Sequence, residues 1–301
     1  MKLSYGKQIE IDRLSEVTID ILIFAKNHEE RALTAFNYIS AKTDVLNAIA
    51  FTYDDNTIPI EGIKFIHIDN QVDIISFLDE SILDSDLTSL NILVDYSCMT
   101  KPWYYTIILY LSQKKLNQQE LNLYFVYTPS KYSKPMAPKP NTVIAPLPGK
   151  YVVPTNKPKA LIVCLGYEQN KAQGIIEHLD PKVCYIFYSK PALDDAFVKT
   201  IEENNRELID HNSNVITFPL DDLIVIEREL VSLYHFLRKD YSIIIAPLGP
   251  KPFTFMAMLL SIKYTDIDIW RVGSGSDINE YERKPVSNSS FIVSYVNFTA
   301  N

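Results

Sequence analysis

The chain repeats one sequence pattern, and this repeat constrains its fold more than any other feature. Residues 18–37 (TIDILIFAKNHEERALTAFN) and 158–177 (PKALIVCLGYEQNKAQGIIE) share the same layout. Each has an apolar run rich in β-branched residues, a short polar loop with a glutamate, a basic residue and an apolar-periodic segment. Arg31 and Lys171 occupy matching places, 140 residues apart. Such self-similarity indicates two copies of one structural unit.

A second pair of matching segments follows in the same order. Residues 91–112 and 242–261 each read as a strand, a tight polar turn, a Lys-Pro-aromatic sequence and a strongly apolar helix. Lys101 and Lys251 are equivalent, 150 residues apart. Two further matches pair 47–53 with 183–189, and 123–129 with 269–275. Because four segments keep their order and similar offsets, the sequence predicts an internal duplication.

Strand-like and helix-like segments alternate within each half. Continuous apolar runs such as ILIFA and IIIAP are typical of strands in a parallel sheet that is covered on both faces. Strands separated by helices favour parallel pairing with crossover connections. The expected third strands are 63–69 and 214–220, and the expected helices include 71–80, 192–210 and 222–238. The predicted fold is therefore α/β, with two tandem Rossmann-like layer sandwiches whose sheets are mostly parallel.

Prolines mark the middle of the chain. Residues 129–158 contain 8 of the 17 prolines. Proline fixes φ and lacks a backbone donor, so this stretch is expected to be an extended connector or an edge segment. The expected domains are a first Rossmann-like half at 1–150, which ends in this connector, and a second at 151–301.

Charge and apolar runs argue against several classes of protein. The formal net charge of -8 argues against a clamp for long nucleic acid. The N-terminus turns polar too early for a signal peptide, and the apolar runs are shorter than a membrane span. Three cysteines, an odd number, read as reduced thiols. A cytoplasmic protein with no membrane partner is expected.

The sequence also lacks the usual motifs for metals and cofactors. Its five histidines form no His-x-x-x-His pair, and no Cys-x-x-Cys occurs, so no metal site is expected. There is no Walker motif and no G-x-G-x-x-G. No cofactor is therefore expected, including a dinucleotide held in the usual Rossmann manner.

Ligands of doubly wound sheets bind beyond the carboxyl ends of the strands, near the switch in strand order. In each half this rule selects the loop after the first strand and the loop before the Lys-Pro helix. The candidate ligand-binding residues in these loops are Asn27, Glu29, Arg31, Asp95, Ser97, Thr100, Lys101, Glu168, Asn170, Lys171, Gly249 and Lys251.

The Lys-Pro pair suggests an anion site. Pro102 and Pro252 suit the first helical position, and the Thr100 hydroxyl is expected to cap its helix. The helix N-terminus would then offer free N–H groups and a partial positive charge, to which a lysine adds a full one. The alternative is an ordinary helix start with Lys101 and Lys251 solvated.

Other candidates have equally plain structural explanations. Glu29 and Glu168 would contact sugar hydroxyls, or would favour a helix N-terminus. Ser97 and Cys98 follow a strand but lack the flanking glycines of a nucleophile elbow. The aromatic residues that open the two Lys-Pro helices would stack on bases, or belong to the core or to an interface.

The Asp95–Trp103 and Ala246–Phe253 segments resemble the late motif of CARF domains, the Rossmann-like nucleotide sensors of prokaryotic antiviral systems. The opening loops at Asn27–Arg31 and Gly166–Lys171 belong to the same plan. Two such units in one chain are similar to the SAVED arrangement. The resemblance implies a cyclic oligonucleotide ligand and a role in antiviral defence. The chain departs from the family pattern in lacking an effector domain and a glycine in the first late turn.

We therefore expect a protein that senses an anionic nucleotide in a cleft between its halves, with a protein partner that supplies the output. Lys101 and Lys251 would pair with phosphates, and the opening loops would line the opposite wall. One alternative is a metal-independent, ring-nuclease-like phosphodiesterase, in which Ser97 or Thr100 positions the ligand. Others are an enzyme that uses a nucleotide sugar, and an assembly subunit without a ligand.

Overall fold

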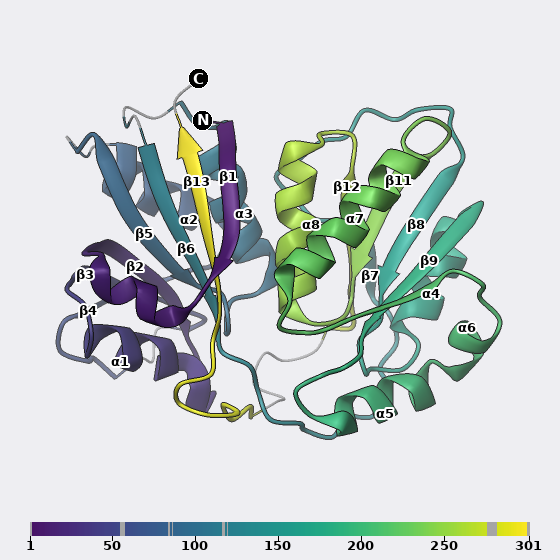
Figure 1. The fold of residues 1–301 in the computed structure, drawn as a ribbon, viewed down its shortest axis with the longest axis horizontal. Helices are drawn as coiled ribbons and strands as arrows, with labels where there is room; N and C mark the ends of the chain where they lie inside the picture. Colours follow the sequence, from purple (N-terminus) through teal and green to yellow (C-terminus); the bar gives the residue numbers. More distant parts are fainter. Residues whose placement is uncertain are drawn as a thin grey trace. The chain divides into compact units, whose positions relative to one another are not determined.

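The computed structural model describes residues 2–54, 58–83, 85, 87–115, 118, 120–275 and 282–299, apart from the side chain of Tyr5. The chain forms two compact units (Figure 1). Unit 1 is Met1–Lys131 with Tyr281–Asn301, and unit 2 is Tyr132–Glu280. Each unit has a mostly parallel sheet and interspersed helices, which confirms the α/β fold class. Within the described ranges, every helix is too short or too polar to cross a lipid bilayer.

Unit 1 contains a seven-stranded sheet in the order β1-β13-β6-β5-β2-β3-β4. The five strands from β6 to β4 are parallel, and β13 and β1 extend the sheet in antiparallel pairing. The strands are β1 (Lys2–Ile9), β2 (Ile19–Lys26), β3 (Val45–Thr52), β4 (Ile63–His67), β5 (Ser89–Asp95), β6 (Glu120–Tyr127) and β13 (Ile292–Thr299).

Helices cover both faces of this sheet. On one face, Leu14 of the 3₁₀ helix η1 (Ile11–Glu16) and Ile39 of α1 (Thr34–Ser40) pack on β2, β3 and β5. On the other, rings of α2 (Gln71–Leu78) and α3 (Lys101–Gln113) contact Phe51 of β3. A short π-helix, η3 (Asp79–Leu83), continues α2.

Unit 2 contains a six-stranded sheet in the order β10-β9-β8-β11-β12-β7. The first five strands in this order are parallel, and β7 pairs antiparallel with β12 at the edge. The strands are β7 (Val143–Pro146), β8 (Lys159–Cys164), β9 (Val183–Ser189), β10 (Val215–Phe218), β11 (Ser242–Pro247) and β12 (Asp268–Gly273).

The helices of unit 2 also form two layers. Residues of α4 (Lys171–Leu179), α5 (Asp195–Asn204) and α6 (Arg206–Asp210) pack on one face of the sheet. Phe253 of α8 (Lys251–Lys263) meets Phe187 of β9 on the other face, and α7 (Leu223–Leu237) packs against α8. The expected strands and helices are therefore present, although the expected helix at 192–210 is two helices.

The parallel parts of the two sheets have the same strand order. β4-β3-β2-β5-β6 corresponds to β10-β9-β8-β11-β12, and an antiparallel strand follows in both sheets. The added strand differs in its place along the chain: β13, beside β6, comes after the parallel strands of unit 1, whereas β7, beside β12, comes before those of unit 2. The shared order is what the predicted duplication requires. The duplication itself stays a prediction.

The units differ in their limits from the halves expected at 1–150 and 151–301. β7 lies within the proline-rich segment and pairs with β12, which assigns it to unit 2. β13 pairs with β1 and β6, which returns the C-terminal segment to unit 1. The limits of the units differ because strands far apart in sequence pair through their backbones. A division of the chain at its proline-rich linker cannot predict such pairs.

Candidate functional site

The switch in strand order lies between β2 and β5 in unit 1, and between β8 and β11 in unit 2. The chains that leave these neighbouring strands pass to opposite faces of the sheet, where parallel folds bind ligands. Asp95 is the last residue of β5, and the other eleven candidate residues lie in the loops or first helical turns after these four strands. Each unit is described by itself below.

In unit 1, an ion pair fills the loop after β2. The Nε of Arg31 donates to Oε2 of Glu29 over 2.6 Å, and the two side chains are only 2% and 7% exposed. The two terminal nitrogens of Arg31 donate to the carbonyls of Ser97 and Thr128, each over 3.0 Å. The guanidinium therefore ties together the loops that follow β2, β5 and β6.

This environment keeps Arg31 charged. Burial by itself would lower the pKa of Arg31, but Cys98, Tyr127 and Glu29 act in the opposite direction and raise it above its ordinary value. The guanidinium carbon also lies 5.8 Å from the centre of the Tyr127 ring. A guanidinium buried in this way holds the loops together, and the surrounding protein keeps solvent away from it.

Asp95 and Ser97 belong to the same buried network. Oδ1 of Asp95 accepts from the Ser97 backbone N–H over 2.9 Å, and Oγ of Ser97 accepts from the Thr128 N–H over 2.7 Å. Both side chains are buried. Asn27 joins through Oδ1, which accepts from the Glu29 N–H over 3.1 Å. Of these residues, only the half-buried Asn27 reaches the surface.

The capping role expected for Thr100 is wrong. Thr100 is the N-cap residue of α3, but its side chain makes no capping hydrogen bond. A cap accepts from the second or third N–H of a helix. The second residue here is Pro102, which has none, and the Trp103 N–H donates to the Thr100 carbonyl over 3.1 Å. Because Pro102 has no N–H and the Trp103 N–H is already bonded, this helix start has fewer free N–H groups than expected. The half-buried Lys101 places a positive side chain there.

The aromatic residues at the helix starts belong to the core. Trp103, Tyr104, Tyr105, Phe253 and Phe255 are all buried. Trp103 stacks on Tyr53 with ring centroids 4.2 Å apart. Trp103 also contacts Phe51 of β3, and Phe253 contacts Phe187 of β9. Because all five rings are buried, they are not open at the surface for base stacking in this structure.

In unit 2, the loop after β8 is more open. Lys171, the first residue of α4, forms an ion pair with Glu168, and their side chains are 21% and 33% exposed. Asn170 is the N-cap residue with φ 67°, and its side chain makes no capping hydrogen bond. This pair is therefore within reach of solvent, in contrast to the Glu29–Arg31 pair.

The two glycines of unit 2 let its loops touch. A Cβ on Gly249 would lie 2.5 Å from the Leu165 carbonyl oxygen, and one on Gly166 would lie 2.7 Å from the Leu248 carbonyl oxygen. Gly249 therefore serves close packing of the loops after β8 and β11. Two residues further on, the half-buried Lys251 begins α8, whose N-cap residue, Pro250, cannot cap through its side chain.

Sequence reasoning missed several residues around these loops. Thr128 supplies a backbone donor and a backbone acceptor to the unit 1 network. Because only its backbone takes part, the residue type at this position gave no indication of the role. Tyr132 and Phe197 pack on Tyr167 in unit 2, with ring centroids 6.5 and 5.5 Å from it. The aromatic character of these residues was a usable signal, but their sequence separation concealed the cluster.

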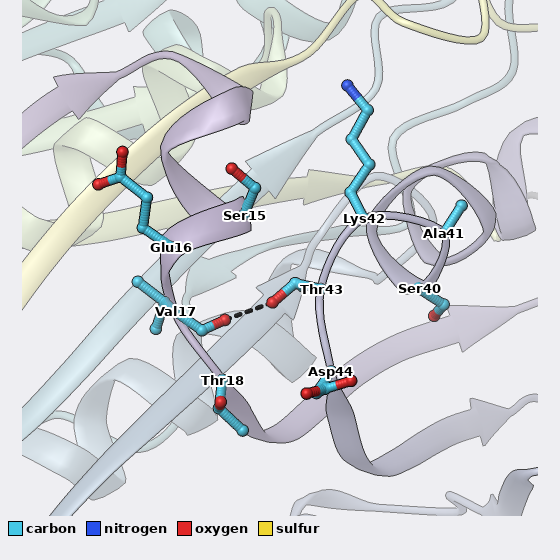
Figure 2. A pocket seen from close by; sticks show the side chains of 9 residues that line it. All are labelled: Ser15, Glu16, Val17, Thr18, Ser40, Ala41, Lys42, Thr43 and Asp44. Carbon is cyan, nitrogen blue, oxygen red and sulfur yellow. Dashed lines mark hydrogen bonds between the residues drawn. The ribbon is translucent and has the colours of Figure 1, made fainter.

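A polar cavity of about 350 Å³ lies at the amino ends of β2 and β3 in unit 1, away from the carboxyl ends where the candidate loops lie (Figure 2). Its lining comes from the segments before β2 and β3: Ser15, Glu16, Val17, Thr18, Ser40, Ala41, Lys42, Thr43 and Asp44. Lys42 already bonds Asp12 over 2.7 Å, and the Thr43 hydroxyl donates to the Val17 carbonyl. None of the twelve candidate residues lines this cavity.

No group of three or more His, Cys, Asp or Glu residues that could hold a metal ion occurs in the described part of the chain. No protein-family model matches the sequence. No curated protein matches it either. The resemblance to CARF and SAVED domains therefore stays a prediction.

Proposed function

We propose that this chain binds an anionic nucleotide at the carboxyl edges of its parallel sheets. The observation that supports the proposal is that α3 and α8 begin alike. α3 follows β5 and α8 follows β11, which hold corresponding places in the two sheets. Each helix starts with a half-buried lysine and a proline, without a side-chain cap. A lysine at a helix N-terminus combines a full charge with the positive end of the helix dipole, which attracts phosphate.

The contacts divide the candidate residues by role. Lys101 and Lys251 would contact phosphates, with Asn27 and Lys171 nearby in the opening loops. Glu29, Arg31, Asp95 and Ser97 would shape the loops from beneath, because they are buried. Within the proposed ligand class, the resemblance to CARF and SAVED domains favours a cyclic oligonucleotide and a role in antiviral defence, with a protein partner for the output.

The phosphodiesterase alternative receives no support from Ser97. Its hydroxyl is fully buried and accepts from the Thr128 N–H. A positioning group must reach the substrate, and this one lies beneath the surface. Of the two residues expected to position the ligand in that alternative, the half-buried Thr100 is the one that stays within reach of solvent.

The test is a thermal-shift screen with linear and cyclic nucleotides. We expect a ligand at about 100 times its dissociation constant to stabilise the wild type by about 2.7 kcal/mol. The Lys101→Ala/Lys251→Ala protein should lose this stabilisation. The matched control is Lys64→Ala/Lys182→Ala, which removes two exposed lysines away from the candidate loops and should keep it. An unchanged ligand-induced shift in the Lys101→Ala/Lys251→Ala protein would refute the proposed site.

A further inference from the structure

The proline-rich segment contains an exposed stretch of unit 2, residues 134–140 (KPMAPKP). Residues 131–142 all belong to the described part of the chain, and they form neither helix nor strand. Six of the seven residues from 134 to 140 are exposed, and Pro135 is half-buried. Met136, the one large apolar side chain of the stretch, is 48% exposed. The stretch is therefore open to contact with another molecule.

The spacing of the prolines restricts the backbone of this stretch to extended conformations. Proline fixes φ near about −65°, and a residue before a proline is kept away from the helical region. Six of the seven residues fall under one of these two rules: Lys134, Pro135, Ala137, Pro138, Lys139 and Pro140. Both rules agree with the polyproline II helix, which needs no hydrogen bonds of its own. The sequence therefore favours polyproline II over residues 134–140.

Side chains at both ends attach the stretch to the loop after β8. The Tyr132 hydroxyl lies 2.9 Å from Oγ1 of Thr200, and the Tyr132 ring contacts the ring of Tyr167. At the other end, Nδ2 of Asn141 donates to the Asn170 carbonyl over 3.1 Å. A segment held at both ends loses less conformational entropy on binding than a free chain does. The stretch is therefore presented to a partner in a restricted form.

We propose that residues 134–140 are a docking segment for a partner protein with an aromatic-lined groove. Polyproline II has three residues per turn, so Pro135 and Pro138 lie on the same edge of the segment. Prolines with this spacing dock in grooves lined by aromatic side chains. Lys134 and Lys139 are exposed beside them, and their charge favours a groove with an acidic rim. The inference goes beyond the proposed function and does not depend on the nucleotide site.

The experiment measures binding of the full chain to a panel of purified SH3 and WW domains with acidic groove rims, by isothermal titration calorimetry without nucleotide. We expect binding by at least one domain. Pro135→Ala/Pro138→Ala should weaken it by roughly four- to thirtyfold, because each proline restricts the unbound segment. Pro138→Ala alone, at an exposed position, should weaken it by a smaller factor.

Two further double variants complete the experiment. Pro154→Ala/Pro158→Ala is the matched control, because it changes two exposed prolines of the same proline-rich segment that are four residues apart. It should bind like the wild type. Lys134→Glu/Lys139→Glu should weaken binding, and more strongly at low salt than at high salt. All variants should melt within about 2 °C of the wild type, which shows that they are folded.

Three results would overturn the inference. The first is that no domain of the panel binds the wild type. The second is that Pro135→Ala/Pro138→Ala binds as tightly as the wild type, even if Lys134→Glu/Lys139→Glu does not, since the prolines would then have no part in docking. The third is an equal loss in Pro154→Ala/Pro158→Ala. Because the assay contains no nucleotide, these results are independent of the test of Lys101 and Lys251.

Discussion

Arg31 and Glu29 form a buried ion pair, with 2.6 Å between Nε and Oε2, across one intervening residue. The pair sits where three strand ends of unit 1 meet, because Arg31 also bonds the carbonyls of Ser97 and Thr128. A buried ion pair is stable only when further hydrogen bonds satisfy its remaining polar atoms, and the two carbonyls do this for Arg31. The pair therefore organises the loops that surround the candidate site.

Arg31→Met is expected to lower the free energy of unfolding of unit 1 by about 3–5 kcal/mol, because it leaves Glu29 buried without its partner. Adding Glu29→Gln should recover part of this loss. Urea denaturation, followed through Trp103 fluorescence in a Trp270→Phe background, measures the change. Arg13→Met is the control: it breaks an exposed ion pair of 3.9 Å and should cost about 0.5 kcal/mol or less. Equal costs for Arg31→Met and Arg13→Met would contradict the buried-pair account.

Lys150 should make stability depend on pH in the alkaline range. Its amino group donates to the carbonyls of Ser261 and Ile267, and burial lowers its pKa to about 8, against the influence of Asp268 and Asp266. Between about pH 8 and the ordinary value of 10.5, the unfolded lysine binds a proton that the folded one has lost. Stability therefore rises with pH in this window, and the penalty for charging Lys150 is fully present below it.

The measurement for Lys150 is the difference in unfolding free energy between the wild type and Lys150→Met at several pH values from 7 to 10. Other groups titrate in both proteins and cancel in the difference. The difference should move in favour of the wild type as the pH rises through 8. A flat difference, or one that moves in favour of Lys150→Met, would refute the lowered pKa.

Gly249→Ala should destabilise unit 2 by about 1–3 kcal/mol, because the new Cβ would lie 2.5 Å from the Leu165 carbonyl oxygen. The backbone around Leu165 or Gly249 must move to make room for this Cβ. Gly6→Ala serves as the control, since its Cβ would meet the Tyr295 carbonyl oxygen at an ordinary 3.8 Å. Thermal denaturation of both variants tests the difference. A Gly249→Ala protein as stable as Gly6→Ala would show that the loops after β8 and β11 separate without cost.

Val296→Asp tests the dependence of unit 1 on its C-terminal strand. Val296 is fully buried in β13, between Gly6 of β1 and Leu123 of β6. A buried carboxylate there should lower stability by more than about 3 kcal/mol. Amide hydrogen exchange should show protection lost in β1 and β6 and kept in β8 and β11. Val72→Asp, at an exposed position of α2, is the control and should leave protection unchanged. Equal loss in both units would mean that they unfold together.

The strands at the centre of each sheet were predictable because their signals are local. β2 and β8 are short continuous apolar runs, which strands covered on both faces require. The Lys-Pro helix starts were also predictable, since proline belongs in the first turn of a helix. The absence of a side-chain cap from Thr100 could not be predicted, because it depends on which N–H groups Pro102 and Trp103 leave available.

The candidate loops could be predicted from the rule that ligands bind at the carboxyl ends of parallel strands. The roles of the side chains in these loops could not be predicted from that rule. Arg31 and Lys171 match in sequence, yet Arg31 is buried with Glu29 and Lys171 stays within reach of solvent.

The sequence by itself determined the alternation of strands and helices and the two-unit plan, because hydrophobic periodicity and turn residues act over a few positions. The tertiary structure alone decided that β1 pairs with β13 and that β7 belongs to unit 2. It also decided that Arg31, which was expected to line the wall of a ligand cleft, is buried in an ion pair with Glu29. These outcomes depend on backbone pairing and burial among residues far apart in the chain, which local pattern does not encode.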